Sequence, residues 1–212
     1  MQERGGKSDG RSKGARERLL DAALRVIRSK GYSATTVDDL CAAAGVTKGA
    51  FFHHFRTKEE LGIAAAAHFS AMADGIFSTA PFMAIDDPFE RLIGYVDFRR
   101  AIIGGELPAF TCLVGTMVQE AYATHPALRE ACARSIEEHA AMVEAIVAEV
   151  IAARGDPTGQ GARSLALYTQ AAIQGAFILA KASNDPQAAT DCLDHLRRYL
   201  ECLFGAPPAP TV

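Results

Sequence analysis

The side chains with the most evident chemistry lie together in residues 44–61, which read AGVTKGAFFHHFRTKEEL. The ammonium of Lys48 can reach guanine O6 and N7 or a phosphate, and the imidazole of His53 can donate to a phosphate or to an acceptor on a base. Gly49 and Ala50 carry no bulk, so the backbone beside them can approach a duplex closely. This pattern favours binding in a DNA groove; the alternative is an aromatic-rich helix that only packs into a core.

Two short helices with a tight turn between them would position these side chains. Thr36 can cap a helix, with Asp39 at the capping-box position, and Gly45 suits a left-handed helix end. One residue further on, Thr47 can cap a second helix. Two short helices joined in this way form a helix-turn-helix, whose second helix lies in the major groove.

The second helix also needs a face toward the protein. Phe51 and Phe55, four residues apart, are expected to face inward and to close a small core with a helix over about 15–30. Lys58 opens the next helix, and we expect it to be exposed. There an ammonium and a free backbone amide can hold one phosphate.

Helical periodicity continues through the rest of the chain. Thr57 and Glu60 form a second capping box. Further on, helical spacing is shown by Phe89, Leu92, Tyr95, Val96 and Arg99. The expected helices cover about 58–78, 87–104, 108–123, 126–154, 161–182 and 186–204.

The expected fold is all-α: an N-terminal three-helix helix-turn-helix DNA-binding domain followed by a six-helix ligand-binding and dimerisation domain. The predicted boundaries are a mobile basic arm at 1–13, the DNA-binding domain at 14–60, the helical domain at 61–204 and a disordered tail at 205–212.

Charge is divided unevenly along the 212 residues. Residues 1–60 hold twelve Lys and Arg against eight Asp and Glu, a charge of +4, and residues 61–212 hold ten against seventeen, a charge of −7. A basic head on an acidic body is expected when only one end meets phosphate. A chance fluctuation of surface charge is the alternative.

Residues 31–61, GYSATTVDDLCAAAGVTKGAFFHHFRTKEEL, resemble the DNA-binding region of the TetR (tetracycline repressor) family of transcription regulators. The similarity covers about residues 15–65. It includes the order Gly-Tyr, Thr-Thr, Ala-Gly-Val, an aromatic pair with His-Phe, and Thr-Lys-Glu-Glu-Leu. The resemblance implies a homodimeric, all-helical repressor whose C-terminal domain binds a small-molecule inducer.

Carried over by position, the resemblance marks a set of DNA-proximal residues: Thr36, Thr47, Lys48, Gly49, Phe52, His53, His54 and Lys58. Two positions depart from the family pattern. Members often have Tyr where this chain has Phe52, so a hydroxyl contact with phosphate is unavailable. Cys41 replaces the usual small Ala under the reading helix.

The C-terminal two thirds contains no G-x-S-x-G, no H-E-x-x-H and no tight acidic cluster. We therefore expect no enzyme, no metal and no cofactor, but a pocket between helices. Large or aromatic residues and a few polar ones are its candidate lining, although each could be plain core: Tyr95, Phe110, Met117, Tyr122, His139, Met142, Tyr168, Gln170 and Gln174.

Cys112 forms a separate hypothesis. It lies near an expected helix start, where the helix dipole favours a thiolate. Some regulators that resemble this chain sense electrophiles or oxidants through a cysteine in this region. The alternative is a small, buried, apolar cysteine.

The last two helices carry apolar and small residues suited to a four-helix dimer interface. The candidates are Ala172, Gly175, Ala176, Leu179, Cys192, Leu196, Tyr199 and Leu203. The alternative is that these faces complete the core of each monomer. A dimer would place two reading helices about one duplex turn apart, suited to a palindrome.

Neither a secretory signal nor a long uninterrupted apolar span is evident, so a cytoplasmic location without a membrane partner is expected. Five cysteines without a C-x-x-C pair suggest reduced thiols. The leading hypothesis is a ligand-responsive repressor of double-stranded operator DNA. Its rivals are an activator of the same design and a helical protein with an inactive DNA head that binds a small molecule, is redox-reactive or acts as an enzyme.

Overall fold

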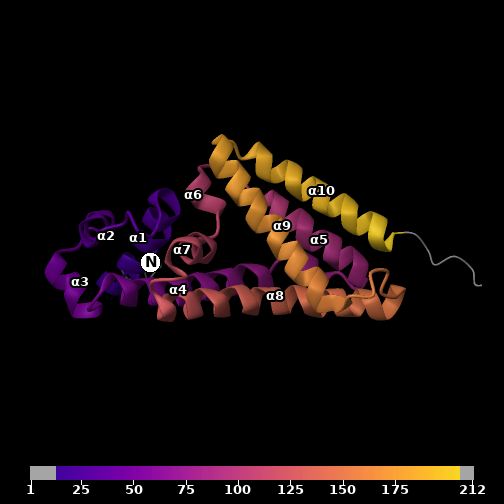
Figure 1. Ribbon diagram of the computed structural model, residues 1–212, viewed down its shortest axis with the longest axis horizontal. Helices are drawn as coiled ribbons and strands as arrows, with labels where there is room; N and C mark the ends of the chain where they lie inside the picture. Colours follow the sequence, from indigo (N-terminus) through magenta and orange to yellow (C-terminus); the bar gives the residue numbers. More distant parts are fainter. Residues whose placement is uncertain (1–12, 206–212) are drawn as a thin grey trace, which may run out of the picture.

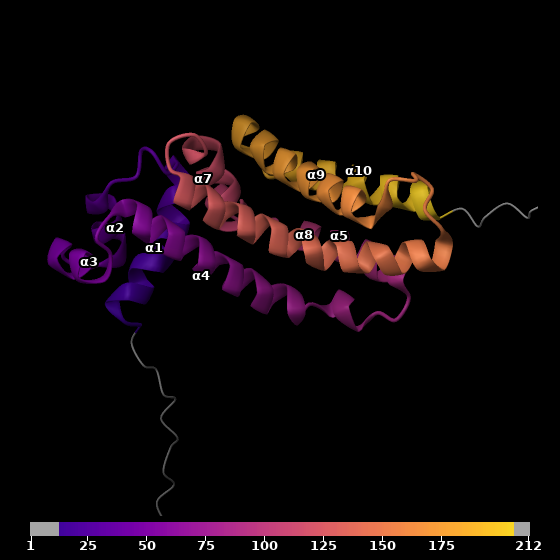
Figure 2. The ribbon, with the colours of Figure 1, turned by 60° about the horizontal axis from the view of Figure 1, so that its bottom comes forward.

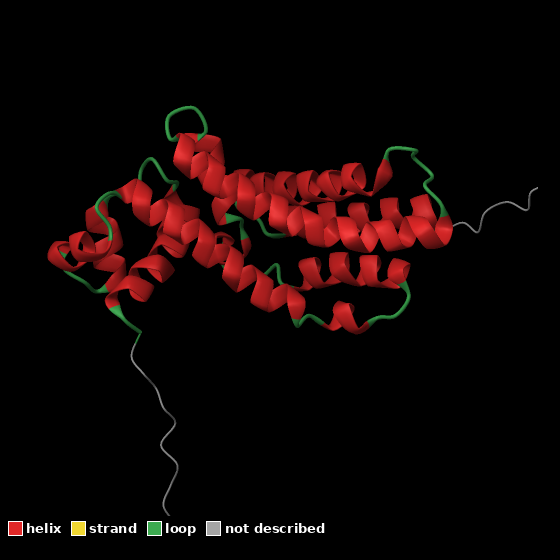
Figure 3. Cartoon of the chain, turned by 90° about the horizontal axis from the view of Figure 1, so that it is seen from below, coloured by secondary structure: helices red, strands yellow, loops and turns green. Residues whose placement is uncertain are grey.

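The structure, a computed structural model, describes residues 13–205, and every regular element in that range is helical (Figures 1 and 3). The elements are α1 Ala15–Lys30, α2 Val37–Ala44, α3 Lys48–His54, α4 Lys58–Ser78, the short 3₁₀ helix η1 Pro81–Ala84, α5 Pro88–Ala101, α6 Leu107–Phe110, α7 Leu113–Ala121, α8 Pro126–Arg154, α9 Gly161–Ser183 and α10 Gln187–Phe204. The all-α prediction is confirmed. Apart from Lys13 and Gly205, the expected arm and tail lie outside the described residues.

Local capping explains the two short helices of the helix-turn-helix. Asp39 N donates to the Thr36 hydroxyl (3.1 Å) while Thr36 N donates to the Asp39 carboxylate (2.8 Å), which completes the predicted capping box. Gly45 ends α2 in the left-handed conformation (φ 62°, ψ 42°), as predicted. Only a residue without a Cβ adopts this conformation at no steric cost.

The second predicted capping box forms only in part. Glu60 N donates to the Thr57 hydroxyl at 3.0 Å, so the hydroxyl cap of α4 is present. The Glu60 carboxylate, however, accepts from the backbone N of Arg56 (2.9 Å) rather than from Thr57. The backbone amide of Arg56, one residue before the cap Thr57, therefore faces the Glu60 carboxylate.

Two hydrophobic cores follow one another along the molecule. We term residues 15–66 the head and residues 67–204 the body. The head core is closed by Phe51 and Phe55, both buried as predicted, but it also contains Leu113 and Met117 of α7. The body core lies among α5, α8, α9 and α10. The long helices α4 and α8 run side by side between the two ends (Figure 2).

The helix expected over 108–123 is two helices. The backbone of Thr111 is extended between α6 and α7, and Cys112 caps α7 by accepting from Gly115 N at 3.3 Å. Buried Arg28 of α1 stabilises the break, because its Nη1 donates to the carbonyls of Ala109 and Thr111, each at 3.2 Å. Helical periodicity in the sequence cannot reveal a break that depends on a side chain 81 to 83 residues away.

One described helix, α4, is long and apolar enough to cross a membrane by length and composition alone. In the fold, its first half supplies Leu61 and Ala65 to the head core, and Phe77 near its end belongs to the body core. Met72 and Ile76, which are more exposed, line a cavity described below. Its apolar character is thus accounted for by packing on two cores and a cavity.

Candidate nucleic-acid interface and ligand cavity

The helix α3 has one face in the head core and one in solvent. Its outer face presents Lys48, Phe52 and His53, with Phe52 55% exposed. Thr47 caps the helix by accepting from Ala50 N (3.2 Å). A Cβ added at Gly49 would meet only the Thr47 hydroxyl within 4 Å, at 3.7 Å, so this side of α3 is open to a close approach. The geometry suits insertion into a groove.

Lys48 is held by an acidic neighbour in this structure. Its Nζ lies 2.8 Å from a carboxylate oxygen of Asp38 on α2, and both side chains are more than half exposed. The hydrogen bond to Asp38 raises the pKa of Lys48, so the amine stays charged. An exposed pair of this kind is weak, so a phosphate or a base can replace Asp38 as the partner.

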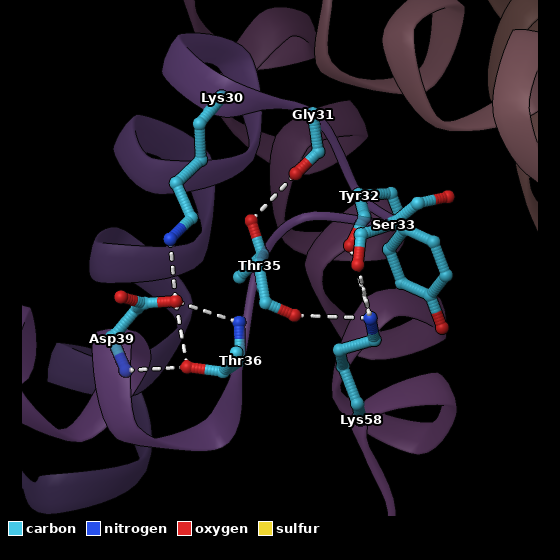
Figure 4. Close-up of polar contacts among 8 residues, drawn as sticks. All are labelled: Lys30, Gly31, Tyr32, Ser33, Thr35, Thr36, Asp39 and Lys58. Carbon is cyan, nitrogen blue, oxygen red and sulfur yellow. Dashed lines mark hydrogen bonds and ion pairs between the residues drawn. The ribbon is translucent and has the colours of Figure 1, made fainter.

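Thr36, Lys30 and Asp39 are bonded to one another at the start of α2 (Figure 4). The Thr36 hydroxyl donates to Asp39 at 2.6 Å, and the Lys30 ammonium lies 2.6 Å from the same carboxylate oxygen. The hydrogen bonds from Lys30 and from Thr36 hold the pKa of Asp39 far below its usual range. Thr36 is exposed at the start of α2, but its hydroxyl already serves the cap. His54, at the end of α3, is half-buried.

Lys58 departs from the prediction that it would be exposed. It is half-buried, and its ammonium donates to the carbonyls of Tyr32 and Thr35, both at 3.0 Å (Figure 4). The Tyr32 ring lies beneath it, with 4.5 Å from Nζ to the ring centroid. Burial lowers the pKa of Lys58. The side chain thus holds the turn between α1 and α2, a role that depends on residues 23 to 26 positions away.

Helix α7 holds the same turn from the other side. The Glu120 carboxylate accepts from the backbone N of Tyr32 (3.2 Å) and of Ser33 (2.7 Å). Gly31 has φ 88°, a backbone conformation that favours glycine, and a Cβ there would lie 2.4 Å from a Glu120 oxygen and displace that carboxylate. The head is therefore fastened to α7 by hydrogen bonds as well as by its core.

A cavity of about 220 Å³ opens between α4, α5, the α6–α7 break, α8 and α9. Five of the predicted ligand-binding residues line it, namely Phe110, Cys112, His139, Gln170 and Gln174. Sequence reasoning missed Arg28, Phe77, Arg99 and Phe177, which line it as well. Arg99 could have been identified from the sequence, because a charged residue at an otherwise apolar helix position is costly to bury unless it has a polar or charged partner.

Tyr95 stands behind the cavity wall and organises it. It is fully buried, and its hydroxyl lies 3.0 Å from His139 Nε2 and accepts from the Gln170 amide at 3.1 Å. Burial, followed by the charge of Arg99, lowers the pKa of His139 to about 3, so the imidazole is neutral at physiological pH. Burial also raises the pKa of Tyr95.

The other predicted lining residues lie elsewhere. Met117 is completely buried in the head core, because α7 packs there, and Tyr122 is 60% exposed just after α7. Met142 packs against the body core. Tyr168 lies on the outer face of α9, half exposed, with its ring centroid 5.1 Å from that of Tyr199.

The predicted dimer residues fall into two groups. Leu179 and Tyr199 are exposed, and four others are half-buried: Ala172, Gly175, Cys192 and Leu203. Ala176 and Leu196 are instead buried in the body core, where α9 and α10 pack on α5 and α8, and so offer nothing to a second copy. The outer face also exposes Leu167 and Ile178.

Within residues 13–205, no group of three or more His, Cys, Asp and Glu side chains is placed to hold a metal ion. An exposed basic helix beside a head core, with a small cavity behind it, defines a DNA-binding regulator with a ligand-binding body.

Comparison with known families agrees with this class. Residues 19–65 match the family described as "Bacterial regulatory proteins, tetR family", and residues 88–195 match "Transcriptional regulator LmrA/YxaF-like, C-terminal domain". The chain belongs to the TetR family of transcriptional regulators. Members of this family are typically cytoplasmic DNA-binding repressors and are not enzymes.

Individual relatives are more distant. The HTH-type transcriptional repressor DhaR of Mycobacterium sp. (strain GP1) is 29% identical over 71% of this chain and 72% of its own length. The uncharacterized HTH-type transcriptional regulator YerO of Bacillus subtilis is 34% identical over 58 residues, 27% of this chain, and only 20% of YerO is spanned. The crystal structure of regulatory protein TetR from Rhodobacter sphaeroides superimposes with a TM-score of 0.76 at 25% identity, over 87% of this chain and 98% of that one.

Proposed function

We propose that this protein is a ligand-responsive transcriptional repressor that binds a palindromic operator as a homodimer and is released by a small-molecule inducer. The observation that carries the proposal is the outer face of α3, where Lys48, Phe52 and His53 stand exposed on a helix whose other face is buried. Phe52 offers an apolar contact to a thymine methyl group, and Lys48 offers a cation to guanine or phosphate.

Arg28 supports a link between ligand and DNA. It lines the cavity, it belongs to α1 of the head, and it donates to the carbonyls at the α6–α7 break. A ligand that moves the break would move these carbonyls and with them α1. Such a ligand favours one arrangement of the head over another, and the populations shift accordingly.

The exposed apolar face of α9 and α10 supports a homodimer. Five large apolar side chains are exposed on these two helices: Leu167, Tyr168, Ile178, Leu179 and Tyr199. Exposed apolar side chains that gather on one surface mark an interaction site. A second copy packed there in two-fold symmetry would present two α3 helices, and these would have to lie about 34–36 Å apart to bind half-sites one duplex turn apart.

Selection of bound duplexes from a random DNA pool tests the proposal. The wild type and Arg134→Ala, an exposed cation of α8, are expected to enrich one palindrome that Lys48→Ala loses. Enrichment of a single, non-palindromic half-site would contradict the dimer. No enrichment at low salt would favour a small-molecule-binding protein with an inactive head.

We propose as a second candidate signal an electrophile or oxidant that reacts at Cys112. Its Sγ accepts from Gly115 N at the start of α7, and it lines the cavity together with Arg28. Lys181, whose pKa burial lowers, lines a neighbouring hollow with it. Alkylation would replace the thiol hydrogen by carbon and disturb the α7 cap.

The test compares DNA release by N-ethylmaleimide in the wild type, Cys112→Ser and Cys202→Ser, the last being an exposed cysteine of α10. Release is expected in the wild type and Cys202→Ser and not in Cys112→Ser. Equal release in all three would remove Cys112 from the proposal.

A further inference from the structure

The helix α5 carries three arginines, and one differs from the other two. Arg91 lies 2.8 Å from Glu149, and Arg100 lies 2.7 Å from Asp194. Arg99 forms neither an ion pair nor a hydrogen bond with any described residue, yet it is half-buried and lines the cavity. Its five N–H donors are therefore available to a ligand.

Aromatic packing holds this guanidinium in place. Its central carbon lies 5.2 Å from the ring centroid of Phe77 and 5.7 Å from that of Phe177, both within cation–π distance. Stacking on ring faces takes up the flat sides of a guanidinium and leaves its hydrogen-bonding edge free. The cation is thus positioned before any ligand arrives.

A second donor comes from His139. The Gln170 amide donates to the Tyr95 hydroxyl, which leaves the phenol hydrogen available to donate to His139 Nε2, 3.0 Å away. A neutral imidazole that accepts at Nε2 carries its hydrogen on Nδ1, which has no partner among the described residues. His139 lines the cavity and lies close enough to Arg99 for that charge to lower its pKa.

The remaining wall is mainly apolar. Phe69, Met72, Ile76, Phe110 and Ile136 contribute to it. Two carboxylates also border the cavity, Asp74 and Glu138, but both side chains are exposed, and neither forms an ion pair with Arg99. The volume of about 220 Å³ is below the range of about 300–1,000 Å³ usual for drug-sized ligands, so a small molecule fits.

We propose that the cavity binds a small apolar carboxylic acid as its anion. The carboxylate takes the free edge of Arg99 and the Nδ1–H of His139, and the hydrocarbon part lies against Met72, Ile76 and Phe77. The assignment rests on the proposed function only in taking this cavity as the inducer site. A neutral ligand would leave a desolvated cation without a counter-charge, which is unfavourable.

Isothermal titration of the full chain with octanoate and with octanamide, its uncharged counterpart, tests the inference. The wild type is expected to bind octanoate at least about tenfold more tightly than octanamide, since hydrogen bonds to charged groups contribute this much. Arg99→Met, which keeps the apolar stem, is expected to lose that preference, and Arg99→Lys to keep part of it. Arg100→Met, at the neighbouring arginine outside the cavity, is the matched control and should match the wild type.

Equal binding of octanoate and octanamide by the wild type would overturn the inference. An Arg99→Met variant that still prefers octanoate would overturn it too, as would no octanoate binding at millimolar concentration. Titration needs no DNA, so its outcome is separate from that of duplex selection. A protein that selects no operator but binds octanoate through Arg99 would refute the proposed function and leave this inference intact.

Discussion

The head and the body differ in where their polar side chains find partners. In the head, Thr36, Asp39 and Lys58 bond to backbone or side chains of the head itself. In the body, Arg99 and one nitrogen of His139 face a cavity without a partner among the described residues. A region whose polar groups are satisfied internally keeps one shape, whereas one that keeps donors free is arranged for a ligand.

The largest expected effect separates the two faces of α3. Phe51→Ala removes a completely buried ring from the head core and should lower the free energy of unfolding by about 3–5 kcal/mol. Phe52→Ala, on the exposed face, should leave that free energy nearly unchanged and weaken operator binding. Urea unfolding followed by circular dichroism measures the free energy of unfolding of each variant, and a DNA titration measures operator binding. Equal losses of unfolding free energy in the two variants would contradict a helix with one buried and one exposed face.

The next effect concerns the body and acidic pH. The folded pKa of His139 is about 3, below the usual value of 6.5, so between these values the unfolded chain binds more protons. Stability contributed by the neutral imidazole is complete above pH 6.5 and is lost as the pH falls toward 3. His139 changes the free energy of unfolding by at most about 1.4 kcal/mol per pH unit.

Unfolding in urea at several pH values between 4 and 7 checks this. His139→Gln should flatten the dependence, whereas His195→Gln, at an exposed histidine of α10, should not. A wild-type stability independent of pH in this range would show that His139 is not neutralised by burial.

A smaller effect contrasts two lysines of the head. Lys58→Met leaves carbonyls of the α1–α2 turn without their donor and should cost about 1–3 kcal/mol of stability. Lys48→Met should leave stability unchanged and reduce the log–log salt slope of DNA binding by about 0.9 if Lys48 contacts a phosphate. Thermal unfolding and binding at several salt concentrations distinguish the two roles; a salt slope changed by Lys58→Met alone would reverse them.

The smallest effect comes from Asp38. Asp38→Asn frees Lys48 from its ion pair and removes a negative charge beside α3, so operator affinity should rise by a few fold at low salt. Glu17→Gln, an exposed acid of α1, serves as the control for loss of a charge. Reduced affinity in Asp38→Asn would mean that the carboxylate positions Lys48 for DNA.

Several features of the site could be predicted because they depend on neighbours in sequence. The caps at Thr36 and Thr47, the left-handed Gly45 and the inward Phe51 and Phe55 all involve residues within four positions of one another. The caps and the glycine depend on local hydrogen bonds and backbone conformation, whereas the four-residue spacing of Phe51 and Phe55 places them on one helix face that α1, α4 and α7 then bury. Three of the predicted cavity residues, His139, Gln170 and Gln174, could also be found, because polar residues on apolar helix faces are uncommon.

Other features could not be predicted, because their partners lie far along the chain. The break between α6 and α7 depends on Arg28 of α1. The role of Lys58 depends on carbonyls of the turn between α1 and α2. Whether an apolar side chain of α9 faces core, cavity or solvent depends on which helices pack beside it, which is why Ala176 and Tyr168 lie away from their predicted sites.

The sequence alone determined the helix-turn-helix, the exposed outer face of α3 and the all-helical class, since hydrogen bonds and periodicity over a few residues suffice for them. The tertiary structure alone decided that Lys58 holds a turn, that Arg28 joins α1 to the α6–α7 break, and that Arg99 keeps a free edge in a cavity. Each of these depends on the relative positions of helices, which are determined by packing over the whole molecule rather than by local spacing.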